Sequence, residues 1–165
     1  MTTFDFGCGP VPAHRHSNGG GWVADTTTVA ETVFVGRGAR VSGNASVRDY
    51  AVIGGNAEVC GEANVYGKST IYDKAIIGGS AQVYDNASVY GNAVICDDAV
   101  VNGRASVRGR ALVRDEAVVG GQSLVHGDAV VSGISNIGGR IVVAGNTILH
   151  DKQINSSSAN PRIAW

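Results

Sequence analysis

Residues 39–65 read ARVSGNASVRDYAVIGGNAEVCGEANV, and an aliphatic side chain stands at every sixth position of this stretch, starting at Val41. A small residue stands two positions before each aliphatic residue, and Gly or Asp stands two positions after it. The small and the aliphatic side chains point to the same side of a short strand, because strand side chains alternate with a period of two. Gly and Asp tolerate the backbone dihedrals of a sharp corner. The stretch therefore predicts short strands joined by equivalent corners.

The same spacing continues along most of the chain without an insertion or a deletion. Equal strands joined by equal corners close into a prism whose turns stack at strand spacing, about 4.8 Å apart. An α-helix would need a period near 3.6 and fewer β-branched and Gly residues. The prediction is an all-β, single-stranded parallel β-helix. The aliphatic positions are Val23, Val29, Val35, Val41, Val47, Ile53, Val59, Val65, Ile71, Ile77, Val83, Val89, Ile95, Val101, Val107, Val113, Val119, Val125, Val131, Ile137, Val143 and Leu149.

The two ends of the chain do not follow the hexad. Residues 1–22 contain two prolines and three consecutive glycines, and residues 150–165 are mostly polar. A stacked solenoid needs its open ends covered, because terminal coils otherwise offer free backbone to other chains. We therefore predict an irregular N-terminal cap or arm over residues 1–22, a β-helix over 23–149 and a C-terminal tail over 150–165.

The composition of the chain indicates its class and compartment but not its activity. The chain has 165 residues, which is typical of one domain, and its formal net charge of -1 gives no global attraction to nucleic acid or to anionic membranes. Three cysteines without a CxxC pair argue against a disulfide framework. The N-terminus shows no signal-peptide pattern, and no apolar run is long enough to span a membrane. We expect a cytoplasmic protein that requires no cofactor.

The small-x-aliphatic-x-Gly/Asp hexad resembles the transferase-hexapeptide superfamily of left-handed β-helices. That resemblance implies a left-handed triangular prism with three hexads per coil, which gives about seven coils here. It also implies frequent homotrimers and, as a candidate activity, acyl transfer from acetyl-CoA. Residues 9–22, GPVPAHRHSNGGGW, resemble the start of uncharacterised phage and prophage repeat proteins, which implies a host cytoplasm or a virion as the setting.

Two enzyme alternatives can be weighed against the histidines. An acyltransferase of this superfamily would need a general-base His held by a partner, and the outward-facing His126 is the candidate, although the sequence shows no orienting partner. A zinc enzyme resembling γ-carbonic anhydrase would need three converging His ligands. His14 and His16 could supply two of them, and no third ligand is evident. We therefore predict neither a catalytic residue nor a metal site.

An apolar row on the outside of the prism is the strongest surface feature. It contains one residue from each of five successive coils, and an exposed patch of this length indicates an interface. The expected partner is a second copy of the chain in a homotrimer. The alternative is that the C-terminal tail folds over the row. The row consists of Ile76, Val94, Leu112, Val130 and Ile148.

Aromatic and basic side chains also repeat at coil spacing. Such rows could bind a flat ligand or a phosphate-bearing one such as a nucleotide, although tyrosine stacking and solvated arginine side chains are equally ordinary in a sheet. The candidate ligand-binding residues are Tyr66, Tyr84, Tyr72, Tyr90, Arg104 and Arg108.

The sequence as a whole favours a non-enzymatic structural or binding protein related to phages. Its homotrimeric β-helix would bind a host-defence component, a nucleotide or another part of a virion. The uninterrupted repeat favours a non-enzymatic role, because no inserted loop interrupts the hexads to form a substrate site. The alternatives are an acetyl-CoA-dependent acyltransferase and a γ-carbonic-anhydrase-like metal enzyme.

Overall fold

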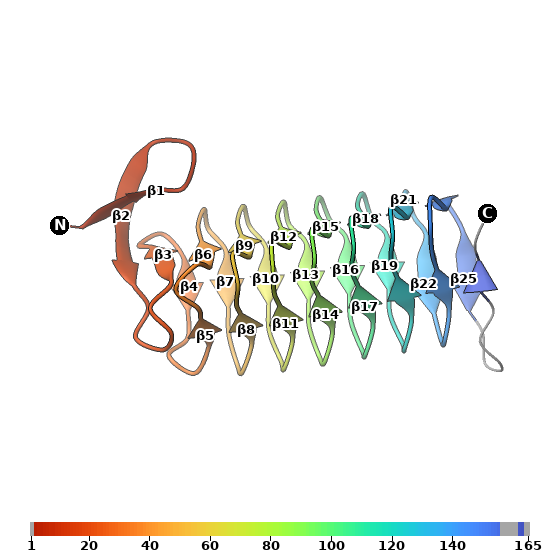
Figure 1. The fold of residues 1–165 in the computed structure, drawn as a ribbon, viewed down its shortest axis with the longest axis horizontal. Helices are drawn as coiled ribbons and strands as arrows, with labels where there is room; N and C mark the ends of the chain where they lie inside the picture. Colours follow the sequence, from red (N-terminus) through yellow and green to blue (C-terminus); the bar gives the residue numbers. More distant parts are fainter. Residues whose placement is uncertain (1, 156–161, 164–165) are drawn as a thin grey trace.

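The computed structural model describes residues 2–155 and 162–163, which form a parallel β-helix of about seven coils with three sheets (Figure 1). Each coil contributes one short strand to each sheet, and from β3 to β24 the paired strands of adjacent coils are 18 residues apart. The N–H groups of one coil donate to the carbonyl groups of the next, as between Ser42 and Val59 (2.9 Å). This arrangement confirms the predicted triangular prism.

The ten-stranded sheet begins with an N-terminal hairpin and then takes one strand from each coil. Its strands are β1 (Thr3–Asp5), β2 (Pro10–Arg15), β3 (Trp22–Ala24), β6 (Arg40–Val41), β9 (Glu58–Val59), β12 (Ile76–Ile77), β15 (Val94–Ile95), β18 (Leu112–Val113), β21 (Val130–Ser132) and β24 (Ile148–His150).

Two eight-stranded sheets form the other walls, and we name them the β4 sheet and the β5 sheet after their first strands. The β4 sheet contains β4 (Thr28–Val29), β7 (Ser46–Val47), β10 (Asn64–Val65), β13 (Gln82–Val83), β16 (Val100–Val101), β19 (Val118–Val119), β22 (Asn136–Gly138) and β25 (Gln153–Asn155). The β5 sheet contains β5 (Phe34–Val35), β8 (Val52–Ile53), β11 (Thr70–Ile71), β14 (Ser88–Val89), β17 (Ser106–Val107), β20 (Leu124–Val125), β23 (Val142–Val143) and β26 (Arg162–Ile163).

The core contains the two inward positions of each hexad. Val83 and Ala81, for example, are both 0% exposed, and the same holds for their equivalents in most coils. One narrow interior therefore runs along the prism, filled by stacked β-branched and small side chains. The residue between the two inward positions, such as Gln82, points outward, as the alternation predicts.

From Gly43 to Asp151, each corner has one residue with positive φ. Gly occupies most of these positions, and Asp occupies the others, as at Asp85 (φ 61°). The Asp85 carboxylate accepts a hydrogen bond from the N–H of Gly103 at the corresponding corner of the next coil (3.1 Å). Asp49 and Asp115 act in the same way on Gly67 and Gly133. Asp is suited to these corners because it tolerates left-handed dihedrals and its short carboxylate binds local backbone N–H groups.

The N-terminal segment is more regular than the sequence indicates. Strands β1 and β2 form an antiparallel hairpin, and β2 pairs antiparallel with β3, so the hairpin extends the ten-stranded sheet beyond the first coil. In Figure 1 this hairpin lies at the N-terminal end of the prism and extends to one side of it. Segment 1–22 therefore contains a cap that pairs with the first coil.

At the C-terminal end, parallel pairing continues past Leu149. Strand β25 pairs with β22 and β26 pairs with β23, so the β-helix reaches into the predicted tail. The spacing slips there, because Gln153 pairs with Asn136, one residue closer in sequence than in the preceding coils. Within the described residues, no helix could cross a membrane.

Candidate functional site

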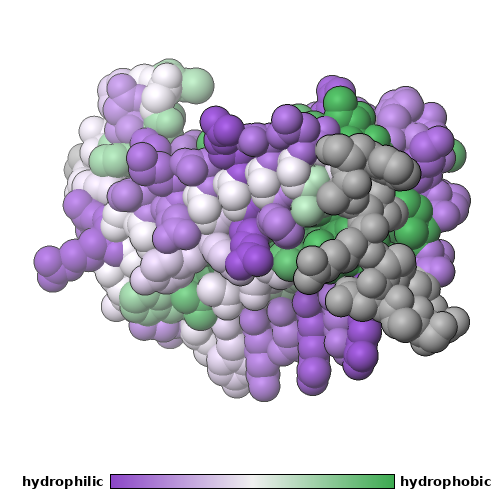
Figure 2. Space-filling view, turned by 45° about the vertical axis from the view of Figure 1, so that its right-hand side comes forward, coloured by the Kyte–Doolittle hydropathy of each residue, from purple (hydrophilic) through white to green (hydrophobic). Residues whose placement is uncertain are grey.

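The outward apolar row of the ten-stranded sheet is the main candidate site, and we call it the apolar ladder. Its five residues come from β12, β15, β18, β21 and β24, and the strand register places each directly beside the next. Ile76 is 39% exposed and Ile148 is 69% exposed, while the three residues between them are half-buried by their neighbours. Figure 2 shows the larger apolar areas toward the C-terminal end of the molecule. The structure therefore brings together all five predicted residues.

The N-terminal half of the same face is built differently. Trp22 of β3 stacks on Phe4 of the hairpin, with ring centroids 4.6 Å apart, and the guanidinium of Arg15 lies 4.2 Å from its ring centroid. In the next two coils Arg40 and Glu58 form an ion pair at 3.2 Å. The outer face is thus covered by the chain's own hairpin at its start, charged in the middle and aliphatic from Ile76 onward.

The two prism edges beside the apolar ladder carry different charges. The edge between the ten-stranded sheet and the β4 sheet carries a series of carboxylates with one arginine among them, Arg114. The opposite edge, reached from the β5 sheet, carries Lys74, Arg108 and Arg110 together with Asp73 and Asp128. Arg110 is paired with Asp128, with its Nε 2.6 Å from Oδ1. Five carboxylates lie close together along the middle of the acidic edge: Glu62, Asp97, Asp98, Asp115 and Glu116.

Tyr66 and Tyr84 form a second ladder, on the corner that follows the β4 sheet. Their rings are stacked with centroids 4.8 Å apart and planes 4° apart. The guanidinium of Arg48 lies 4.6 Å from the Tyr66 centroid, and Asn102 donates a hydrogen bond to the Tyr84 hydroxyl (3.0 Å). Both faces of Tyr66 are therefore occupied by the chain itself, so a flat ligand would have to displace Arg48 to stack there.

The other predicted ligand-binding residues do not form one compact group. Tyr72 is 46% exposed, and its ring lies over Gly54, because a Cβ on Gly54 would come within 2.1 Å of the ring. Tyr90, one coil on, contacts Arg108 through its hydroxyl at 3.5 Å. Arg104 is exposed on a different edge. These residues thus lie along two edges of the prism.

The histidine candidates have separate surroundings. The His126 ring has no hydrogen bond or ion pair within residues 2–155 and 162–163. His14 Nδ1 lies 2.7 Å from Asp25 Oδ1, whereas His16 is buried and its Nδ1 lies 3.2 Å from the Asn18 carbonyl. Across residues 2–155 and 162–163, no three His, Cys, Asp or Glu side chains are placed to hold one metal ion.

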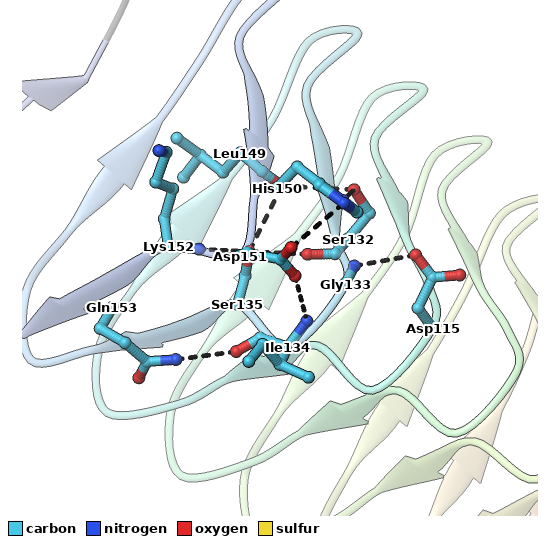
Figure 3. Close-up of polar contacts among 10 residues, drawn as sticks. All are labelled: Asp115, Ser132, Gly133, Ile134, Ser135, Leu149, His150, Asp151, Lys152 and Gln153. Carbon is cyan, nitrogen blue, oxygen red and sulfur yellow. Dashed lines mark hydrogen bonds and ion pairs between the residues drawn. The ribbon is translucent and has the colours of Figure 1, made fainter.

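A polar cluster near the C-terminal end was not anticipated from the sequence (Figure 3). Ser132 Oγ lies 3.1 Å from His150 Nδ1, and His150 Nε2 lies 3.3 Å from Asp151 Oδ2. Asp151 Oδ1 also accepts a hydrogen bond from the N–H of Ile134 (2.9 Å). The 18-residue spacing of Ser132 and His150 was the available signal, because it places the two side chains at equivalent positions in adjacent coils.

This cluster joins the last two coils and is unsuited to nucleophilic chemistry. A catalytic serine must reach the substrate, and its oxygen must be free to attack. Ser132 is only 2% exposed, and its hydroxyl also lies 3.4 Å from the Leu149 carbonyl. The contacts therefore hold the turn at Asp151 against β21.

The three cysteines are free thiols that differ in exposure. Cys8 is exposed, and Cys60 and Cys96 are half-buried. Burial, followed by the neighbouring Asp97 carboxylate, raises the pKa of Cys96 from 9.0 to about 11. The pKa of Cys60 is also raised, mainly by burial. A higher pKa leaves less thiolate at neutral pH, so these two thiols are poor nucleophiles.

The alternative to a second copy of the chain is that the C-terminal tail, residues 150–165, folds over the apolar ladder. Residues 156–161 and 164–165 lie outside the described part of the chain, and the described part of this segment includes β25 and β26.

Comparison of the chain with models of known protein families, with curated proteins and with solved structures found no match.

Proposed function

We propose that this chain is a non-enzymatic binding or scaffolding protein that associates with copies of itself through the apolar ladder. The observation that carries this proposal is the continuous row from Ile76 to Ile148 on an otherwise regular sheet. Burying aliphatic side chains at an interface is favourable by about 25 cal/mol per Å² removed from water. The resemblance to hexapeptide-repeat proteins suggests three copies as the assembly.

The charged edges support a second copy as the partner and favour one orientation. If neighbouring copies of the assembly lie with their prism axes parallel and their apolar ladders turned inward, the acidic edge of one lies beside the edge carrying Lys74 and Arg110 in the next. With antiparallel axes the two acidic edges would lie together. Opposed like charges disfavour that arrangement and complementary edges favour the parallel one.

The assembled prism would offer its remaining faces to a further partner. The resemblance of residues 9–22 to phage repeat proteins suggests a host-defence component, a nucleotide or another virion part as that partner. Among the described residues, no cluster favours acyl transfer or zinc chemistry: His126 has no orienting partner there, and the rings of His14 and His16 interact with different groups.

Analytical ultracentrifugation of the full chain tests the self-association. The wild type should sediment as an oligomer at micromolar concentration, and Leu112→Lys should sediment as a monomer, because a lysine in the middle of the interface would bury an unpaired charge. Gln82→Lys is the matched control, since Gln82 is the outward residue of a strand in the β4 sheet. A monomeric wild type, or equal effects of the two substitutions, would overturn the proposal.

A further inference from the structure

A pocket of about 380 Å³ lies where the N-terminal hairpin meets the first coil. It is lined by Arg15, Gly20 and Arg37. Arg15 ends strand β2, Gly20 belongs to the connection to β3, and Arg37 lies at the first corner after the β5 sheet. An isolated bridge between Gly20 and Gly36 joins the connection to that corner. The pocket thus exists because the hairpin pairs with the first coil.

Arg15 is held in place by three contacts. Its Nη1 donates to the carbonyl of Gly20 (2.8 Å) and to the carbonyl of Arg37 (3.3 Å), and its guanidinium packs against the Trp22 ring. An exposed arginine normally loses side-chain entropy when it binds a ligand. Since these contacts already restrict Arg15, its remaining N–H groups are positioned before any ligand arrives.

Arg37 departs from the repeat. At the equivalent corner position the later coils place Gly or Asp with positive φ, including Gly55 and Asp73, whereas Arg37 lacks positive φ, as do Asp25 and Glu31 at the other two corners of the first coil. The first coil therefore differs from the others in backbone, and this corner is its only one with an arginine. The rules that explain the other corners do not require an arginine here.

The charge of the two arginines is not compensated by the chain. Within the described residues, the ion pairs involve other groups, and neither Arg15 nor Arg37 lies within ion-pair distance of a carboxylate. The guanidinium group presents its N–H donors in a planar fork that matches the oxygens of a phosphate. Two such groups suit a phosphate monoester, which carries about two negative charges at neutral pH, better than a single carboxylate.

From this geometry we propose that the pocket binds the phosphate group of a small molecule. Arg15 is the fixed donor, and Arg37 closes on the anion from the other side. The site lies at the N-terminal end, away from the apolar ladder, so it does not depend on self-association.

Isothermal titration calorimetry on the full chain tests the site with orthophosphate, pyrophosphate and ribose 5-phosphate. Saturable binding is expected, and Arg37→Gln should weaken it about tenfold or more, because one charged hydrogen-bonding partner is lost. Tighter binding of ribose 5-phosphate would assign a phosphorylated small molecule, and equal or tighter binding of orthophosphate would assign the free ion. Arg15→Lys, which keeps the charge but loses the planar fork, should also weaken binding.

Arg140→Gln is the matched control, because it removes an exposed arginine from another edge of the prism. It should leave the affinity unchanged. Circular dichroism before titration should show that Arg37→Gln folds like the wild type, as expected for an exposed side chain without a partner in the chain. Absence of saturable binding with all three ligands, or equal weakening by Arg37→Gln and Arg140→Gln, would overturn the proposal.

Discussion

Three side chains of each hexad have distinct roles, and the neighbours Gln82 and Val83 show how sharply these roles change along a strand. Val83 is 0% exposed in the prism interior, while Gln82 is exposed on its outer surface. The sequence predicts this difference because the aliphatic position repeats without drift. It predicts much less about the outward position, where the identity of the residue is free to vary.

Val83→Asp should destabilise the protein by about 3 kcal/mol or more, because it would bury an unpaired carboxylate in the core. Gln82→Asp, one residue earlier and exposed, should change the free energy of unfolding by less than about 1 kcal/mol. Urea unfolding followed by circular dichroism would measure both. Equal stabilities for Val83→Asp and the wild type would show that the inward register is wrong.

Substitutions at Asp85 separate the two reasons for an aspartate at a corner. Asp85→Gly keeps the positive φ but loses the hydrogen bond to the N–H of Gly103, which should cost about 1 kcal/mol. Asp85→Ala should cost about 1 kcal/mol more, since alanine also resists the left-handed conformation. Thermal unfolding of the pair gives the comparison. If Asp85→Ala were the more stable of the two, backbone strain would not determine the residue at this corner.

Alkylation should distinguish the cysteines by their thiolate fractions. Cys96 in a Cys8→Ser/Cys60→Ser variant should react slowly with iodoacetamide at pH 8, because its pKa is raised to about 11 and only the thiolate attacks. Its rate should rise steeply as the pH approaches 11, where the deprotonated fraction becomes large. Mass spectrometry would follow the reaction. A native rate at pH 8 equal to that of the urea-unfolded variant would contradict the expected suppression.

At the scale of elements, the strands and corners follow from the hexad, but the N-terminal hairpin does not. Its strands β1 and β2 contain no repeat, and their pairing with β3 depends on a few specific contacts. The stack of Phe4 on Trp22 joins residues that no spacing rule connects. The Arg15–Arg37 pocket could not be foreseen for the same reason, because it requires the hairpin to fold back on the first coil.

Phe4→Ala should loosen the hairpin without unfolding the prism. The lost aromatic stack is worth about 1 kcal/mol beyond its buried area, which is enough to favour local opening of a small hairpin. Limited proteolysis should then cleave residues 5–10 faster than in the wild type, while the melting temperature of the β-helix changes little. Phe34→Ala, an exposed aromatic in strand β5, provides the comparison. Unchanged proteolysis of Phe4→Ala would show that the backbone pairing alone holds the hairpin.

At the scale of the whole molecule, the prism aligns outward residues that are far apart in the sequence. The apolar ladder could be predicted from the sequence because three hexads per coil, which the resemblance to hexapeptide-repeat proteins implies, place its members on one sheet. The contacts among Ser132, His150 and Asp151 follow the same spacing, yet their geometry also depends on the corner at Asp151. Spacing therefore predicts which residues are neighbours but not which hydrogen bonds they form.

The regular corner has a consequence for insertions and deletions. Removing residues 66–83, a full coil, should shorten the prism while every later side chain keeps its azimuth. Removing only residues 66–71 should preserve the inward pattern but turn everything downstream by one third of a revolution. The apolar ladder would then lie on the β5 sheet and would no longer be aligned with Trp22 and the hairpin.

Both deletions should fold cooperatively in thermal denaturation, since each removes whole hexads, whereas removal of five residues should not. Hydroxyl-radical footprinting would report whether the apolar ladder has moved from the ten-stranded sheet to the β5 sheet. Failure of the six-residue deletion to fold would mean that the three walls are not interchangeable. If both deletions fold, the prism tolerates two kinds of change in chain length. Removing or adding one hexad rotates one end of the prism relative to the other, whereas removing or adding three hexads changes only the distance between the two ends.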